Sequence, residues 1–593
     1  MRPTPTFSSL SVLLLTACST GNASEFEKMS DWYKKYPSYP EYCSTPQQLA
    51  NRKIPTLKKS NNIQTSLVHV TAIIRHGART PWNNHTCWEN WQNHWDCELK
   101  TLTAPPAQPE ILQLEKNATE DMKLDGEGAF FLFEKNYDAL MDAPQLMNLL
   151  NGTCQKGQLL LRGYVQELSN GKMLRSTYVK ERGENKDNHD LVLIDLNEDN
   201  DVRPYEEPRL YYRADDDQRT IMSGQVLLRG LFGDLLLQHS QELGTQVDPT
   251  ISVHTADRVQ DILAANEDVC PRLNDLFEEA KKSPEYIKRF VKSKESKDLN
   301  KLMDTLGGDF RDQAEDCLMT TICNDRDLPD VLDDYGRDEE NNYFDRLDQY
   351  SFRPWTYAMK HNDAAHSKLA FGPLWVEMLS NMLGFVPKST WSSILPQMVS
   401  ELRSPAPQLA LFSGHDTTIL PILATLGENV WDGAQWAPYA SLLSIEIHAV
   451  EASNQRLFRL IYNGKVLTDK MKGCDDELCD VIHLFNRVSD FAVKQRDCGS
   501  SQSFLAEIET WTVGDVLSSK KGLGLILIFT IFSGGLGAFA TYVSLTRRLP
   551  CSRSKGNFKK VGNEDNIEVI SSYGAADTVM RNNDLKLEEN TII

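Results

Sequence analysis

Two short apolar stretches, far apart in the chain, each end abruptly in polar and charged residues. The first, SLVHVTAII at residues 66–74, is rich in β-branched side chains, which is typical of a buried strand. The second, LALFSGHDTTIL at residues 409–420, breaks at a glycine. We expect both turns to lie at the ends of strands in an α/β sheet, where such folds bind ligands.

A third apolar stretch, at residues 522–545, is much longer. It runs for 24 residues without a charge, enough to cross the roughly 30 Å hydrocarbon core of a bilayer. Lys520 and Lys521 precede it, and a larger group of basic residues begins at Arg547. Because positive charge favours the cytosolic side, we expect a single C-terminal transmembrane helix with the tail in the cytosol.

The first 23 residues have the pattern of an export signal. Arg2 precedes a short apolar core at residues 10–17, and small residues follow it. This pattern predicts a secretory signal peptide at residues 1–23. Residues 15–18, LTAC, also resemble a bacterial lipoprotein cleavage site, so the type of export signal stays open.

The turn after residue 74 places one imidazole between two guanidiniums, in Arg75, His76, Gly77 and Arg79. Two planar guanidiniums beside a histidine suit an oxyanion with several oxygens. We expect Gly77 to let the backbone approach such a ligand. Taken alone, the tripeptide RHG fits a basic surface turn equally well.

The longer pattern RHGxRxP, completed by Pro81, and the HD pair of His415 and Asp416 resemble the histidine acid phosphatases, within the histidine phosphatase superfamily. Six further segments match the family in the expected order: 157–168, 211–224, 252–263, 270–276, 437–448 and 462–479. The resemblance implies an α/β fold with a central, mostly parallel sheet flanked by helices. It also implies a smaller helical cap domain, which we place at about residues 280–345.

The resemblance implies a role for each residue of the two motifs. His76 is the expected nucleophile, kept neutral by the nearby guanidiniums, and Asp416 the expected proton donor. The expected phosphate-binding residues are Arg75, Arg79, Arg219 and His415. Arg213 competes with Arg219 for the third arginine. We expect no metal and no cofactor, because the arginines supply the positive charge.

The predicted organisation follows the chain. An N-terminal extension at 24–65 leads to a phosphatase domain at 66–499. A juxtamembrane stalk at 500–521 connects it to the helix at 522–545 and to a cytoplasmic tail at 546–593. Within the phosphatase domain, residues 82–156 form an insert that the family's simpler members lack.

That insert carries four tryptophans and three glycosylation sequons. Asn84, Asn117 and Asn151 begin the sequons, as expected for an exported glycoprotein. The four tryptophans are Trp82, Trp88, Trp91 and Trp95. They indicate either a local hydrophobic plug or a lid over the phosphate site.

Ten cysteines lie between the export signal and the span, an even number that suggests disulfides in an exported domain. The resemblance implies the pairs Cys474 with Cys479 and Cys270 with Cys498. Six cysteines stay unassigned: Cys43, Cys87, Cys97, Cys154, Cys317 and Cys323.

An acidic loop at residues 195–206 has part of a calcium-binding spacing, in Asp195, Asn197, Asp199 and Glu206. Asn200 replaces the glycine that such loops need, and strand-like segments flank it instead of helices. We therefore favour a solvated acidic loop over a calcium site.

Together these features predict a single-pass membrane-anchored acid phosphatase, at the cell surface or facing an endosomal or lysosomal lumen. Small phosphomonoesters are the expected substrates, through a phosphohistidine, and a homodimer is possible. The net charge of −20 argues against nucleic acid. The alternatives are a non-catalytic receptor or adhesion protein, a phosphatase specialised for phytate or lysophospholipids, and a phosphomutase. Inositol polyphosphate phosphatases have the sequence HAE where this chain has His415 and Asp416. This difference argues against an inositol phosphate as the substrate.

Overall fold

The computed structural model describes residues 31–58, 64–83, 85–91, 94–95, 97, 150–183, 191–197, 203–242, 250–332, 335, 342–451, 453–493 and 496–499. These residues belong to one compact unit, Met1–Leu505. The predicted signal peptide, stalk, transmembrane helix, tail, Asn84 and Asn117 lie outside the described residues. Within them, no helix is both long and apolar enough to span a membrane.

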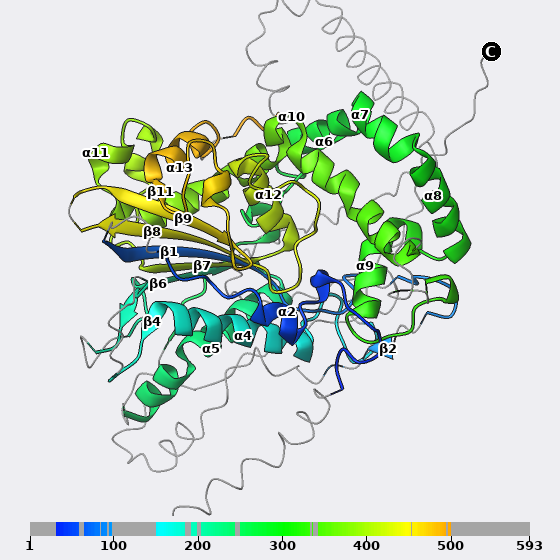
Figure 1. The fold of residues 1–593 in the computed structure, drawn as a ribbon, viewed down its shortest axis with the longest axis horizontal. Helices are drawn as coiled ribbons and strands as arrows, with labels where there is room; N and C mark the ends of the chain where they lie inside the picture. Colours follow the sequence, from blue (N-terminus) through cyan, green and yellow to red (C-terminus); the bar gives the residue numbers. More distant parts are fainter. Residues whose placement is uncertain are drawn as a thin grey trace, which may run out of the picture. The chain divides into compact units, whose positions relative to one another are not determined.

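A seven-stranded mixed sheet forms the centre of this unit (Figure 1). Its strand order is β10-β9-β8-β1-β7-β6, and β11 pairs with β9. The strands are β1 Thr65–Arg75, β6 Leu210–Ala214, β7 Leu409–Gly414, β8 Leu442–Val450, β9 Arg456–Tyr462, β10 Lys465–Val466 and β11 Cys479–Asp480. Two separate pairs are β2 His94–Trp95 with β3 Asn151–Gly152, and β4 Val179–Lys180 with β5 Ile194–Asp195.

The prediction of a mostly parallel sheet is wrong. Strands β6, β7 and β1 run parallel, whereas β8 is antiparallel to β1, and β9, β10 and β11 continue the antiparallel half. The reason is the short connection at residues 451–455 between β8 and β9. A parallel pair needs a long crossover, whereas a connection this short makes an antiparallel hairpin.

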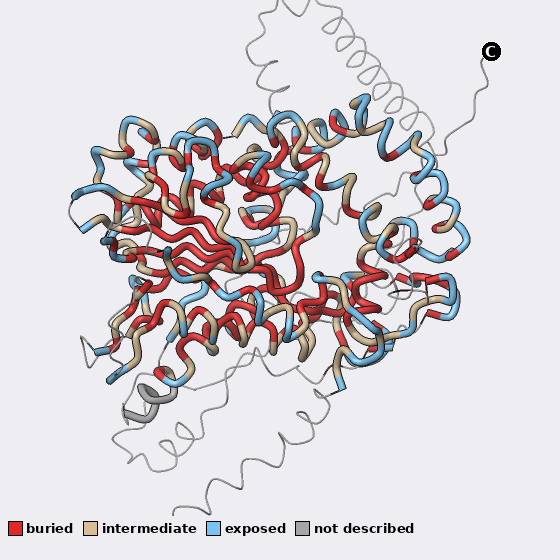
Figure 2. The backbone as a smooth tube through the Cα atoms, in the orientation of Figure 1, coloured by how far each residue is buried: buried red, intermediate tan, exposed pale blue. Residues whose placement is uncertain are grey.

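Helices cover both faces of the sheet. Helices α4 Leu161–Tyr178 and α5 Gln218–Glu242 lie on one face, and α10 Tyr343–Met382, α12 Asp416–Leu426 and α13 Val481–Val488 on the other (Figure 1). Strand β1 shows why, because Ala72 and Ile74 pack with Leu227 of α5, whereas Ile73 packs with Leu423 of α12. A strand buried on both faces reads as a continuous apolar run, and Figure 2 shows most of the length of the central strands buried.

A second group of helices lies away from the sheet, at the right of Figure 1. It comprises α7 Pro284–Tyr286, the π-turn Ile287–Val291, α8 Lys294–Leu306, α9 Phe310–Ile322 and the start of α10. Helix α6 Arg272–Lys282 leads into it. The remaining short helices are η1 Glu41–Cys43, α2 Pro46–Ala50, η5 Arg258–Gln260, η7 Asp330–Leu332, η8 Leu383–Phe385, α11 Lys388–Trp391, η9 Pro396–Ser400 and η10 Thr468–Lys470.

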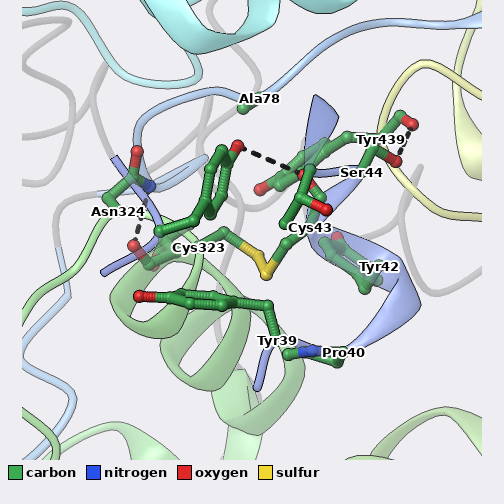
Figure 3. Close-up of a disulfide and its surroundings, with 12 residues drawn as sticks. Tyr39, Pro40, Tyr42, Cys43, Ser44, Ala78, Cys323, Asn324 and Tyr439 are labelled. Atoms are coloured by element: carbon green, nitrogen blue, oxygen red, sulfur yellow. Dashed lines mark hydrogen bonds between the residues drawn. A yellow bond between two sulfur atoms is a disulfide. The ribbon is translucent and has the colours of Figure 1, made fainter. Parts of the chain in front are cut away.

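All ten cysteines of the expected exported region form disulfides. The two pairs that the resemblance implies, Cys270 with Cys498 and Cys474 with Cys479, are present. The six unassigned cysteines pair as Cys43–Cys323, Cys87–Cys317 and Cys97–Cys154. Two of these bonds end in α9 or at its C-terminus. Figure 3 shows one of them, Cys43–Cys323, with Tyr42 and Tyr439 close to it.

The tryptophans of the insert divide between the two interpretations. Trp88 and Trp91 are buried in the core cluster that surrounds α9, and Trp95 is buried beside the Cys97–Cys154 bond. Trp82, in contrast, is 49% exposed. Three of the four therefore form local plugs.

The acidic loop shows ordinary ion pairs. Asp195 pairs with Lys180 at 2.7 Å, and Glu206 pairs with Arg203 at 3.1 Å. Asp199 lies outside the described residues.

Candidate active site

Three adjacent parallel strands end at the same edge of the sheet. Arg75 of β1 lies opposite Gly414 of β7, and Ser413 of β7 lies opposite Ala214 of β6. The residues that directly follow these strands are His76, His415 and Asp215. The carboxyl ends of parallel strands therefore bring together two motifs that are separated by more than half of the chain.

His76 is held in one tautomer and kept uncharged. Its Nδ1 donates to the carbonyl of Gly77 at 2.8 Å, which leaves the lone pair on Nε2. The side chain is buried, and burial, followed by the charges of Arg219 and Arg75, holds its pKa well below the ordinary value. An unprotonated Nε2 is therefore available in acid.

Gly77 has a packing role that the sequence did not reveal. A Cβ at this position would lie 2.5 Å from the Cα of Gly163 in α4. The glycine therefore permits the close packing of α4 against the turn, and its expected role in the approach of a ligand stays a prediction.

Arg75 is completely buried between two tyrosines. Its guanidinium carbon lies 4.5 Å from the ring centre of Tyr42 and 4.6 Å from that of Tyr439. Its Nη2 atom pairs with Asp416 Oδ2 at 2.7 Å. Burial alone would lower its pKa, but Asp416 and the tyrosines raise it. This arginine lies behind Asp416, whereas the pocket itself is lined by Arg79 and Arg219.

Asp416 is surrounded by donors. Besides Arg75, Trp436 Nε1 donates to its Oδ2 at 2.8 Å, and the backbone N–H of Thr417 donates to its Oδ1 at 2.8 Å. It is also the first residue of α12, where the helix dipole favours a negative charge. Although burial would raise the pKa of Asp416, Arg75 and Trp436 hold it below the ordinary value. Asp416 is therefore an anion here.

The other predicted phosphate-binding residues also have acidic partners. Arg79 pairs with Asp316 at 2.6 Å, and both side chains are buried. Arg219 pairs with Asp217 at 2.7 Å at a more exposed position. His415 Nε2 donates to Asp215, which has a pKa below its ordinary value. A bound phosphate would therefore either share Arg79, Arg219 and His415 with these carboxylates or displace the carboxylates from them.

One pocket of about 770 Å³ joins these groups. Its polar end is lined by His76, Arg79, Arg219, His415 and Asp416. Its other walls include the apolar side chains Trp82, Met303, Phe352, Pro354, Trp355 and Trp436. Arg219 lines the pocket, whereas its competitor Arg213 lies on β6 and is not among the lining residues.

The opposite wall comes from α9, which the sequence analysis did not connect to the site. Glu315 and Asp316 of this helix both line the pocket. Asp316 and Arg79 are 237 positions apart, so no local motif could join them. Trp436 and Tyr439 had a detectable signal, because they lie at or beside the family-like segment 437–448.

Two groups of described residues have the composition of a metal site. His85, Cys87 and Cys317 form one, but both cysteines are joined in a disulfide and offer no thiolate. Asp215, Asp217 and His415 form the other. In this second group the carboxylates already pair with His415 and Arg219.

Known proteins resemble this chain over most of its described part. The model of the histidine phosphatase superfamily (branch 2) matches residues 66–463. Counting factor 60 of Dictyostelium discoideum is 25% identical over 450 residues, covering 75% of this chain and 89% of its own. Human lysophosphatidic acid phosphatase type 6 is 23% identical over 464 residues, covering 76% and 90%. Bovine lysosomal acid phosphatase is 27% identical over 301 residues, covering 50% and 61%. The chain belongs to branch 2 of the histidine phosphatase superfamily and is an enzyme of the phosphatase class.

Proposed function

We propose that the protein is an acid phosphatase that cleaves phosphomonoesters through a phosphohistidine on His76. The observation that carries the proposal is the fixed tautomer of this buried ring, with Nδ1 bonded to the Gly77 carbonyl and Nε2 free to attack. Its lowered pKa keeps the nucleophile neutral below pH 6.5, its ordinary value.

In the first step, a bond forms between Nε2 and phosphorus while the ester P–O bond breaks. Arg79, Arg219 and His415 line the pocket and would bind the non-bridging oxygens, and buried Arg75 would add its charge from behind. Asp416 would protonate the leaving oxygen. In the second step water attacks phosphorus, the N–P bond breaks, and Asp416 accepts the water proton.

The decisive experiment is to trap the intermediate. A labelled phosphomonoester, quenched in alkali, should leave base-stable and acid-labile phosphate on His76. The His76→Ala variant should bind no label and show no turnover, with its circular dichroism unchanged. Turnover retained by that variant would refute the nucleophile. A folded wild-type protein with neither label nor turnover would favour the non-catalytic receptor alternative.

The reaction should need no added metal, because the residues in the pocket supply the positive charge. We expect activity to survive dialysis against EDTA. A complete loss that returns with one divalent cation would refute this mechanism, and the Asp215, Asp217 and His415 group would then be the first place to look.

The apolar walls favour a substrate with a large, uncharged leaving group. Trp82 and Trp355, both about half exposed, lie at the pocket together with Phe352 and Trp436. A polyphosphorylated inositol would need cations around its other phosphates. Among the lining residues, the arginine beyond the phosphate-binding ones is Arg311, which is paired with Asp304. An acyl glycerol phosphate therefore fits better than phytate, in keeping with the name of one relative.

We further propose that the enzyme is a glycosylated, membrane-anchored protein with its active site outside the cytosol. The five disulfides support an oxidising compartment, and Asn151, an exposed sequon residue, supports glycosylation. The transmembrane helix at 522–545 rests on the sequence pattern. A lysosomal relative supports residence at the cell surface or in the endolysosomal system.

Protease protection tests this topology. Protease added to intact cells should release an active, glycosylated fragment that lacks an epitope tag placed after Arg547. A tag on the same side as the glycans would refute the single span.

A further inference from the structure

The expected proton donor carries no proton in the free enzyme. Asp416 accepts from Arg75 and Trp436 through one oxygen and from the Thr417 N–H through the other. All three contacts stabilise the carboxylate. A leaving alkoxide nevertheless needs a proton. Another group of the pocket must therefore hold that proton before the substrate binds.

Glu315 is a carboxyl group of the same pocket in the opposite environment. It lies on α9 and lines the pocket together with Asp416. Its Oε1 atom is buried and has no hydrogen-bond partner among the described residues. The group is hydrogen-bonded to Tyr42. A buried carboxylate oxygen without a donor is costly, so the neutral acid is favoured.

Burial and the neighbouring carboxylates act in the same direction. Burial, followed by the negative charge of Asp416, raises the pKa of Glu315 to about 7, although Arg75 and the hydrogen bond to Tyr42 oppose this shift. The charged and titratable groups that interact with Glu315 are Asp416 of α12, Arg75 of β1, Arg79 after β1, Asp316 of α9, Asp348 of α10, Tyr42 of η1 and Tyr439 before β8. At mildly acidic pH, Glu315 is therefore protonated and Asp416 is ionised.

We propose that Glu315 stores the proton that Asp416 delivers to the leaving oxygen, an inference that rests on the phosphatase mechanism above. A bound phosphate dianion competes for the charge of Arg75, which makes Asp416 more basic, and the proton moves from Glu315 to Asp416. It passes to the ester oxygen as the P–O bond breaks and the bond between His76 Nε2 and phosphorus forms. Both carboxyl groups are then anions. The proton released by the attacking water returns to the pair and restores the first state.

The pH dependence of kcat/KM tests this role, because a purely structural residue would not set it. With an alkyl phosphate, the wild-type value should fall as the pH rises through about 7, where Glu315 loses its proton. Glu315→Gln cannot store a proton. Its alkaline limb should move at least about one pH unit toward acid, and its value at pH 6 should fall about 10-fold. Nitrophenyl phosphate should change less, because its phenolate leaves without help.

Glu167→Gln is the matched control. Glu167 of α4 is also a buried carboxyl with a raised pKa and an Oε1 without a partner among the described residues, but it does not line the pocket. Glu167→Gln should keep the wild-type fall of kcat/KM on the alkaline side of the pH profile. Glu315→Asp keeps a titrating group and should restore much of that fall.

Two results would overturn the proposal. One is a wild-type alkaline fall of kcat/KM in Glu315→Gln. The other is an identical loss of kcat/KM in the Glu315→Asp and Glu315→Gln variants. A wild-type enzyme that forms no phosphohistidine would instead refute the underlying mechanism, so the two failures can be told apart.

Discussion

The two sides of the pocket are built by different means. The sheet side comes from the ends of three adjacent parallel strands, and the strand register alone places His76, His415 and Asp215 together. The opposite side comes from α9, which is attached through two disulfides and the ion pair between Asp316 and Arg79. We infer that the sheet side sets the chemistry, whereas the α9 side sets the shape of the pocket and the storage of its proton.

The largest effect is expected from a substitution on the sheet side of the pocket. Asp416→Asn removes the leaving-group acid and leaves the arginines in place, so turnover of alkyl phosphates should fall by about 10² to 10⁴. Vanadate should still bind with nearly wild-type affinity. Single-turnover rates on alkyl and nitrophenyl phosphates are the measurement, and an equal loss for both esters would show that Asp416 is not the acid.

His415→Ala is the companion variant for that experiment. Since His415 is expected to contact the transferred phosphoryl group instead of the leaving group, its loss should slow both esters alike and weaken vanadate binding. A selective loss with the alkyl ester would contradict this assignment.

The next largest effect is expected when the ion pair between Asp316 and Arg79 on the α9 side is broken. Asp316→Asn leaves the buried charge of Arg79 without its counterion, so the free energy of unfolding should fall by about 3 kcal/mol. Urea denaturation measures it. Asp217→Asn is the control, because its partner Arg219 lies in a more exposed pair, and it should cost less than about 1 kcal/mol. Equal losses would mean that the two pairs are equally screened.

Removing a covalent link on the α9 side should have a comparable effect. Replacing both Cys87 and Cys317 by serine should lower the free energy of unfolding by about 2 to 4 kcal/mol. Among enzyme molecules that remain folded, KM should rise more than kcat falls, because α9 is then held less firmly while the strand ends are unchanged. A selective loss of kcat would contradict the proposed division of labour.

The smallest effect concerns the apolar wall. Trp355→Ala should raise KM for an acyl glycerol phosphate by about 10-fold, which corresponds to roughly 1.4 kcal/mol of lost apolar contact. Glycerol phosphate has no acyl chain and serves as the control substrate, with little expected change. A similar increase for both would show that Trp355 supports the phosphate site instead.

The contrast between the sheet side and the α9 side also explains which features could be predicted from the sequence. The strand at residues 66–74 and the turn at His415 and Asp416 were accessible because each depends on a short run of residues. The role of Arg219 stays a prediction, although this residue does line the pocket. The antiparallel half of the sheet was missed because the expectation of a mostly parallel sheet came from the family resemblance. The burial of β8 and β9 on both faces leaves no alternation of polar and apolar residues to correct it. Asp316 and Glu315 were missed because their role depends on packing across more than two hundred residues.

The Cys43–Cys323 bond has a consequence for the order of events during biosynthesis. Its two cysteines are 280 positions apart, so at a synthesis rate of about 5 to 20 residues per second Cys43 waits roughly 15 to 60 s for its partner. Tyr42, which packs on Arg75, is adjacent to the waiting thiol. A newly made chain can therefore close this bond, next to the residue that packs on Arg75, only after the whole of α9 has been synthesised.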